Sequence, residues 1–102
     1  MAITNTTINT ALQPVYTSVG TNAMVVSYFC NTSVNPVMFS VHVVPNGKTA
    51  DGNNIIYSNV NITSGDTYVL DNEKLILSDN DAIHAVATED DVVVVTVCHI
   101  EV

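Results

Sequence analysis

The chain has 102 residues, of which 47% are hydrophobic and only 12% are charged, so it fits one folded domain and not a disordered tail. Ten acidic residues stand against two lysines and no arginine, and the net charge is −8. This charge excludes binding to nucleic acid or to an anionic membrane, because both depend on Lys and Arg. No apolar run approaches the roughly 18 residues of a spanning helix, and the opening MAITNTTINT is not expected to be a signal peptide.

Short runs rich in Val, Ile and Thr alternate with clusters of Asn, Gly, Asp and Pro along the whole chain. β-branched residues favour strands, and the clustered residues favour turns. Turns at this spacing predict an all-β protein, an antiparallel β-sandwich of immunoglobulin-like or jelly-roll-like type with about eight short strands.

In chain order, residues 1–11 are polar and weakly patterned, and we expect a flexible N-terminal arm that orders only on a partner. Residues 12–102 are expected to form the single sandwich domain. Its strands are predicted at 14–19, 23–31, 37–44, 55–62 (with a bend near Asn59), 67–70, 74–77, 82–88 and 92–102, and a turn is predicted at 71–73. The core is expected to contain Val26, Phe29, Phe39, Val41, Ile83, Val86, Val94 and Val97.

The last predicted strand begins apolar on both faces, which suits a central or covered strand. Left unpaired, it would be an adhesive edge. We therefore expect a homo-oligomer, with a trimer favoured, or docking on a larger partner. Candidate interface residues come from the arm and from this strand: Ile3, Thr6, Ile8, Thr10, Leu12, Ile100 and Val102.

Catalytic and metal-binding motifs are missing from the sequence, so we expect no enzyme, no cofactor and no metal site. Cys30 and Cys98 are interpreted as separate thiols, since no Trp accompanies them as in immunoglobulin domains. The three histidines, His42, His84 and His99, lack ligand spacing and are interpreted as half-buried and locally bonded. The acidic turns at 51–54, 79–81 and 89–91 are explained by turn formation, with calcium binding as the alternative.

The order of segments resembles a family of small β-sandwich virion proteins of tailed bacteriophages. The resemblance covers about residues 12–102. It rests on Tyr16-Thr17-Ser18, Gly20, the run 23–31 ending in Cys-Asn, Val43-Val44-Pro45, Ile56-Tyr57, Asp66-Thr67-Tyr68, and the stretch 77–83. In that stretch the family carries a glycine where this chain has Asn80, an exchange that a left-handed backbone tolerates.

The resemblance implies a virion component, assembled in the host cytoplasm and bound to the major capsid protein or to other virion subunits. A capsid decoration (cement) protein that stabilises the capsid lattice is the function we expect. The alternatives are a neck, collar, tail or fibre-attachment protein and, from a different class, a carbohydrate- or receptor-binding module.

Overall fold

The computed structural model describes residues 2–70 and 75–102, and these residues form nine strands and no helix. The predicted turn at 71–73 and the first residue of the predicted strand 74–77 lie outside the described residues. The strands are β1 (Ala2–Ile8), β2 (Gln13–Thr17), β3 (Asn22–Asn31), β4 (Val37–Val44), β5 (Ile55–Ile62), β6 (Thr67–Leu70), β7 (Leu75–Leu77), β8 (Ala82–Ala87) and β9 (Val93–Glu101).

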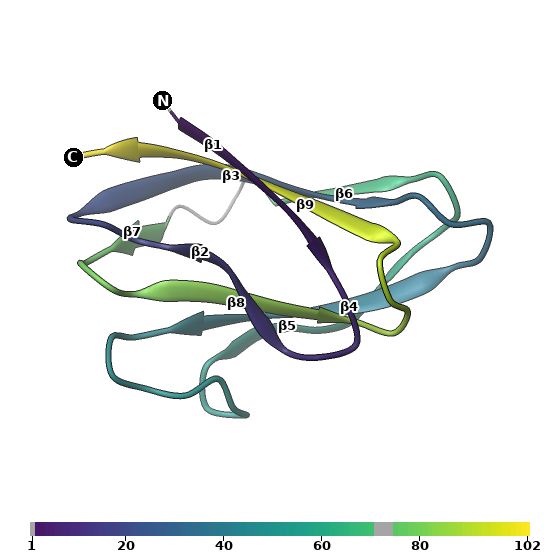
Figure 1. The fold of residues 1–102 in the computed structure, drawn as a ribbon, viewed down its shortest axis with the longest axis horizontal. Coiled ribbons are helices and arrows are strands. Elements are labelled where there is room, and N and C mark those ends of the chain that lie inside the picture. The colour runs from purple at the N-terminus through teal and green to yellow at the C-terminus, as the bar shows by residue number, and fades with distance from the viewer. Residues whose placement is uncertain (1, 71–74) are drawn as a thin grey trace.

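Two antiparallel sheets pack face to face, which confirms the predicted β-sandwich (Figure 1). The first sheet has the order β1-β9-β3-β6, with β7 also paired to β3, and the second has the order β2-β8-β4-β5. Each strand of one sheet therefore has a chain neighbour in the other, as in two interlocked Greek keys. This order is that of a jelly roll with β7 added, so the jelly-roll alternative fits and the immunoglobulin-like one does not.

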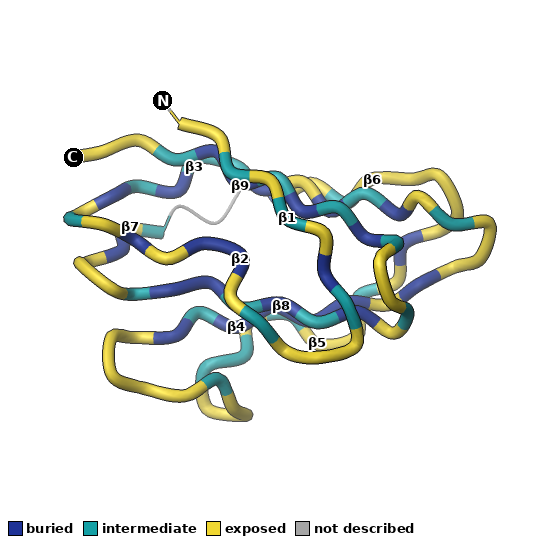
Figure 2. The backbone as a smooth tube through the Cα atoms, viewed as in Figure 1, coloured by how far each residue is buried: buried dark blue, intermediate teal, exposed yellow. Residues whose placement is uncertain are grey.

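An aromatic cluster forms the centre of the core between the sheets. The rings of Phe29 and Phe39 stack with centroids 4.4 Å apart, and Tyr68 meets Phe39 edge-on at 5.6 Å. Figure 2 shows buried residues along the facing strands of both sheets and exposed residues concentrated in the loops. Burial of these rings supplies much of the hydrophobic free energy that holds the two sheets together.

Five of the eight predicted core residues are buried: Phe29, Phe39, Val41, Ile83 and Val97. The prediction was wrong for Val26, Val86 and Val94, which are half-buried because they lie on the outer faces of the sheets. Alternation from the buried Phe29 places Val26 on the outer face, and a register shift between Met24 and Val26 changes the side of the residues before it. The shift lets Met24 join Phe29 on the core face, although strict alternation would separate them.

The N-terminal segment is a strand of the sandwich, and the expectation of a flexible arm at 1–11 was wrong for residues 2–8. Every residue of β1 pairs with β9, from Ala2 opposite His99 to Ile8 opposite Val93. Ile8 is fully buried in the core. The alternating Thr and Ile side chains of β1 suit a strand, but β9, with which β1 pairs, lies at the other end of the sequence.

The C-terminal strand β9 lies between β1 and β3 and is paired along both edges. The expected need to pair its edges is therefore met within the chain. An exposed edge here gives no reason for oligomerisation, and any such reason must come from another surface.

Two Asn residues with positive φ shape the sheets' connections. Asn59 has φ 53° within β5, at the predicted bend, and Asn80 has φ 67° in the turn before β8. Asn80 thus adopts the left-handed backbone in which Asn can replace glycine.

Asn31, fully buried at the end of β3, donates its side-chain amide to the carbonyls of Asn35 (2.8 Å) and Ile62 (3.0 Å).

Candidate functional site

The outer face of the first sheet carries no charged side chain among the described residues. We call this surface the outer face, and it is defined by alternation away from the buried core positions. Its residues are Ile3, Asn5 and Thr7 of β1; Val94, Thr96, Cys98 and Ile100 of β9; Ala23, Val26, Tyr28 and Cys30 of β3; Thr67 and Val69 of β6; and Ile76 of β7. A solvent-facing antiparallel sheet ordinarily alternates to polar residues on this side, so the pattern is unusual.

Strand register gathers the largest apolar side chains at one end of the outer face. Ile100 lies opposite Ala23, which in turn lies opposite Ile76. The next row joins Ile3, Cys98 and Val26.

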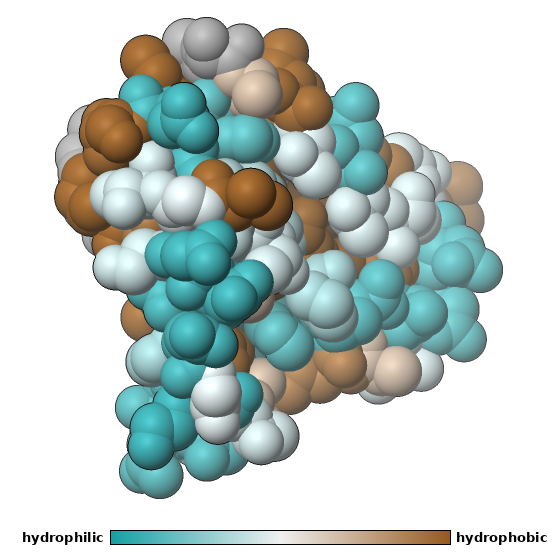
Figure 3. Space-filling model, turned by 60° about the vertical axis from the view of Figure 1, so that its left-hand side comes forward, coloured by the Kyte–Doolittle hydropathy of each residue, from teal (hydrophilic) through white to brown (hydrophobic). Residues whose placement is uncertain are grey.

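Five large apolar residues of the outer face are exposed, with between 39% and 65% of their surface accessible: Ile3, Tyr28, Val69, Ile76 and Ile100. In Figure 3 hydrophobic side chains predominate in the upper part of the view, on the side of the first sheet. Exposed apolar side chains gathered on one face in this way mark an interaction site in many soluble proteins.

A polar row crosses the middle of the outer face. Asn5, Thr96, Tyr28 and Val69 follow one another on β1, β9, β3 and β6. The hydroxyl of Thr96 donates to Oδ1 of Asn5 at 2.9 Å. Because these two groups bond to each other, covering them with another protein costs little in lost hydrogen bonds to water.

The described acidic residues lie away from the outer face. They are Asp51, Asp66, Asp79, Asp81, Glu89, Asp90 and Asp91 in the connections between strands, and Glu101 at the end of β9. By alternation Glu101 points to the opposite side of the sheet from Ile100. Among the described residues, the acidic side chains therefore lie outside the outer face.

Only two of the predicted interface residues, Ile3 and Ile100, lie together on the outer face. Ile8 was wrongly chosen, since it is a core residue. Thr6 faces inward, and its hydroxyl lies 3.5 Å from the carbonyl of Val15.

The other three predicted interface residues lie elsewhere. Thr10 and the exposed Leu12 are at the opposite end of β1, in its connection to β2. Val102 is exposed beyond β9, where its amide donates to the carbonyl of Thr21 at 3.0 Å. The prediction missed Tyr28, Val69 and Ile76, although the alternation within their strands is visible in the sequence.

Two histidines lie opposite each other on the outer side of the second sheet. His42 of β4 pairs with His84 of β8, and Nδ1 of His42 donates to Oδ1 of Asn54 at 2.9 Å. Burial, and secondarily the nearby charge of His42, lowers the pKa of His84 from its ordinary value. At neutral pH His84 is therefore held in its uncharged form.

The third histidine, His99, bonds to residues of two other strands. Its ring lies 4.2 Å from that of Tyr16, with Nδ1 3.3 Å from the Tyr16 hydroxyl and Nε2 3.2 Å from Oγ1 of Thr4. These residues, with Pro14, Val15 and Thr17, line an open hollow of about 360 Å³ between β1 and β2. The hollow holds no carboxylate, so it offers no paired acid and base for catalysis.

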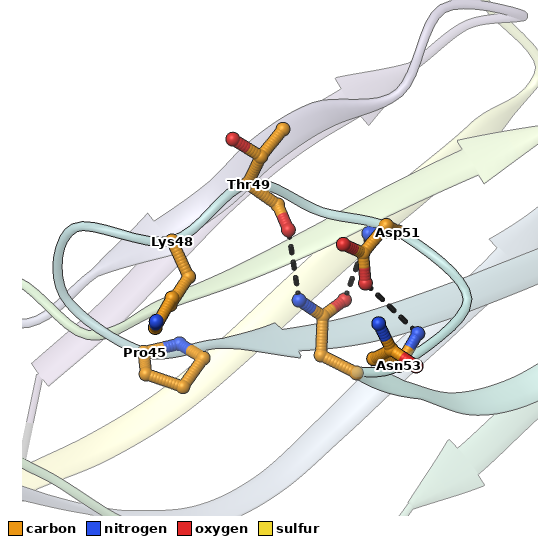
Figure 4. Close-up of a pocket in the computed structure, with 6 residues that line it drawn as sticks. Pro45, Lys48, Thr49, Asp51 and Asn53 are labelled. Atoms are coloured by element: carbon orange, nitrogen blue, oxygen red, sulfur yellow. Dashed lines mark hydrogen bonds between the residues drawn. The ribbon is translucent and has the colours of Figure 1, made fainter.

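A second hollow of about 360 Å³ lies in the loop between β4 and β5, lined by Pro45, Lys48, Thr49, Asp51, Asn53 and Asn54 (Figure 4). Two of its polar side chains form hydrogen bonds within the loop. Asn54 donates to the carbonyl of Thr49 at 2.9 Å, and Asp51 accepts from the amide of Asn53 at 2.8 Å. These bonds are those of turn formation by Asp and Asn.

The other acidic turns bind backbone amides in the same way. Asp79 accepts from the amide of Gly20 at 2.8 Å, and Asp81 accepts from those of Asn46 and Ser78. Asp90 accepts from the amide and the hydroxyl of Thr10, and these bonds lower the pKa of Asp90. Within residues 2–70 and 75–102, no three His, Cys, Asp or Glu side chains are grouped so that they could hold a metal ion.

Both cysteines are free thiols. Cys30 lies opposite Val94, and Cys98 lies opposite Val26, so both belong to the first sheet. Four residues of strand rise separate them by about 13 Å, well beyond the roughly 4.4–6.8 Å between the Cα atoms of a disulfide. An inter-sheet bridge of the immunoglobulin kind is not formed.

The chain matches no protein-family model, no curated protein and no solved structure in the comparisons made. In the part of the chain that the structure describes, there is no helix of the length and apolarity needed to cross a membrane. The uncharged outer face is therefore the feature on which a functional argument rests.

Proposed function

We propose that the chain is a non-enzymatic structural component of a tailed-phage virion, and more specifically a capsid decoration (cement) protein. The observation that carries this proposal is the uncharged, largely apolar outer face of the first sheet, which is built for contact with other protein subunits. The jelly-roll order of the strands agrees with it, because viral capsid proteins use this architecture. The resemblance of residues 12–102 to virion proteins of tailed bacteriophages is the reason for proposing a tailed-phage particle.

The mechanism of such a protein is burial of surface between subunits of the particle. A protein that binds only the assembled lattice stabilises the lattice by mass action, in proportion to the logarithm of its concentration over its Kd. The acidic loops would stay in solvent, where their like charges keep particles apart. The partners are the major capsid protein or other virion subunits, copies of this chain included.

Rebinding to stripped particles tests this function. The Val69→Lys variant, which places a charge on the outer face, should bind at least tenfold more weakly than the parent. Ile56→Lys is the matched control, since Ile56 of β5 is exposed to 42% and Val69 to 43%, in different sheets. Failure of the parent chain to bind particles would refute the proposal.

The number of copies on each particle distinguishes a location on the capsid from one in the neck or tail. Hundreds of copies agree with decoration of the capsid lattice. A number that fits a single ring would instead assign the chain to the neck or tail.

A further inference from the structure

We infer that the outer face is covered by a second copy of this chain, in a twofold dimer whose two first sheets pack face to face. The inference deepens the proposed function and rests on it for the role of the outer face as a subunit contact. It adds the identity of the subunit that makes the contact. The twofold arrangement also differs from the trimer that the sequence favoured.

Charge is the first reason for choosing a second copy. A basic partner would be recognised by acidic side chains within the contact, and the described part of the outer face has none. An uncharged surface is complementary to another uncharged surface, and the outer face of a second copy is one. The net charge of −8 would repel a second copy, but the described acids lie in loops and at the end of β9, outside the contact.

The pattern of rows on the outer face selects the direction of the twofold axis. The row with Ile100 and Ile76 and the row with Ile3 lie at one end of the sheet. An axis parallel to the strands brings these apolar ends together. An axis across the strands would instead place each against the row at the far end of the other copy, which consists of Thr7, Val94, Cys30 and Thr67. At both ends of the sheet the parallel axis sets apolar side chains against apolar side chains and leaves polar groups facing polar groups, and it is therefore favoured.

The same axis exchanges the two sides of the sheet. It lays β9 of one copy over β3 of the other and β1 over β6. In the polar row, Tyr28 then faces Thr96 of the second copy, and Val69 faces Asn5. The contact is isologous, so each pairing occurs twice.

The size of the outer face agrees with a dimer that dissociates on dilution. Four strands spaced by about 4.8 Å and seven residues with a rise of about 3.3 Å give a flat area of roughly 440 Å². The relief of the side chains raises the accessible area toward about 600 Å² on each copy, the lower end for a specific interface. The dimer should therefore form and dissociate within an experimentally accessible concentration range.

Sedimentation equilibrium of the purified chain over a wide concentration range tests the inference. The parent should change from monomer to dimer, and added salt should strengthen the dimer because it screens the like charges. Val69→Lys and Ile100→Lys should each weaken dimerisation at least tenfold, with the fold checked by circular dichroism. Ile56→Lys on the second sheet should leave it unchanged.

A mixing experiment tests the direction of the axis. Val69→Lys and Asn5→Glu should each dimerise weakly alone, and their mixture should form a heterodimer at least tenfold more tightly than either variant. The control mixture of Val69→Lys with Ile56→Glu should show no such gain. Absence of the gain in the first mixture would overturn the proposed packing.

Three other outcomes would overturn the inference: a monomer at every concentration, a trimeric mass, or a dimer unaffected by both lysine variants on the outer face. Particle binding is scored separately. A monomeric parent that rebinds stripped particles would overturn the dimer and leave the virion function standing. A dimeric parent that does not bind particles would overturn the virion function and leave the dimer standing.

Discussion

Replacement of Phe39 by Ala should unfold a large part of the population of this protein under mild stress. Phe39 is 1% exposed, stacks on Phe29 with centroids 4.4 Å apart and meets Tyr68 at 5.6 Å. Removing a buried phenyl ring costs about 3–5 kcal/mol in free energy of unfolding, because apolar contact is lost and a cavity is left. Each lost ring pair accounts for about 0.5–1.5 kcal/mol of that cost.

This cost is large against the stability of a domain of this size, roughly 5–15 kcal/mol. At about 4–8 °C for each kcal/mol, the melting temperature should fall by roughly 12–40 °C. Urea unfolding followed by circular dichroism measures the effect, with an unchanged m value showing that the transition is still two-state.

Met38→Ala is the matched control, because Met38 is the preceding residue of β4 and is exposed on the outer side of the second sheet. Its cost should stay within about 0.5–1 kcal/mol, as for surface substitutions. If Phe39→Ala unfolds at the same urea concentration as the parent, the packing of the two sheets about this ring is wrong.

Three further perturbations test other parts of the structure. Ile8→Ala should cost about 2–5 kcal/mol and Ile3→Ala much less in the same urea assay, since only Ile8 is buried in the core; equal costs would contradict the placement of β1. A reductant should leave the melting temperature unchanged, because Cys30 and Cys98 are free thiols, and a drop of several degrees would reveal a disulfide. The fold favours neutral His84, so the unfolded chain takes up its proton first as pH falls below 6.5, and stability should decrease there; His84→Gln should flatten this part of the stability–pH curve, and an unchanged curve would refute the assignment.

The fold class and most of the strands follow from local patterns in the sequence. Alternation and β-branched residues indicate strands such as 37–44 and 55–62, which the structure has with the same bounds. Asn59 and Asn80 mark backbone with positive φ because Asn tolerates this conformation. Phe29 and Phe39 were predictable as core residues because they are the only aromatic side chains in the sequence without a polar group.

Pairings between distant segments were decided only by the tertiary structure. β1 has the composition of a polar arm, and it becomes a strand because β9, some ninety residues later, offers an open edge. The shift between Met24 and Val26 depends on what β3 packs against, so alternation from Phe29 alone would place the buried Met24 on the outer face.

The outer face was likewise predictable from the sequence only in part. Ile3 and Ile100 were identified because the N-terminal segment and the apolar last strand were expected to take part in contacts with other subunits. Tyr28, Val69 and Ile76 join them only when β3, β6 and β7 are placed side by side. Which side of a strand faces solvent depends on the layer that covers the other side, and for the first sheet that layer is supplied by β2, β4, β5 and β8.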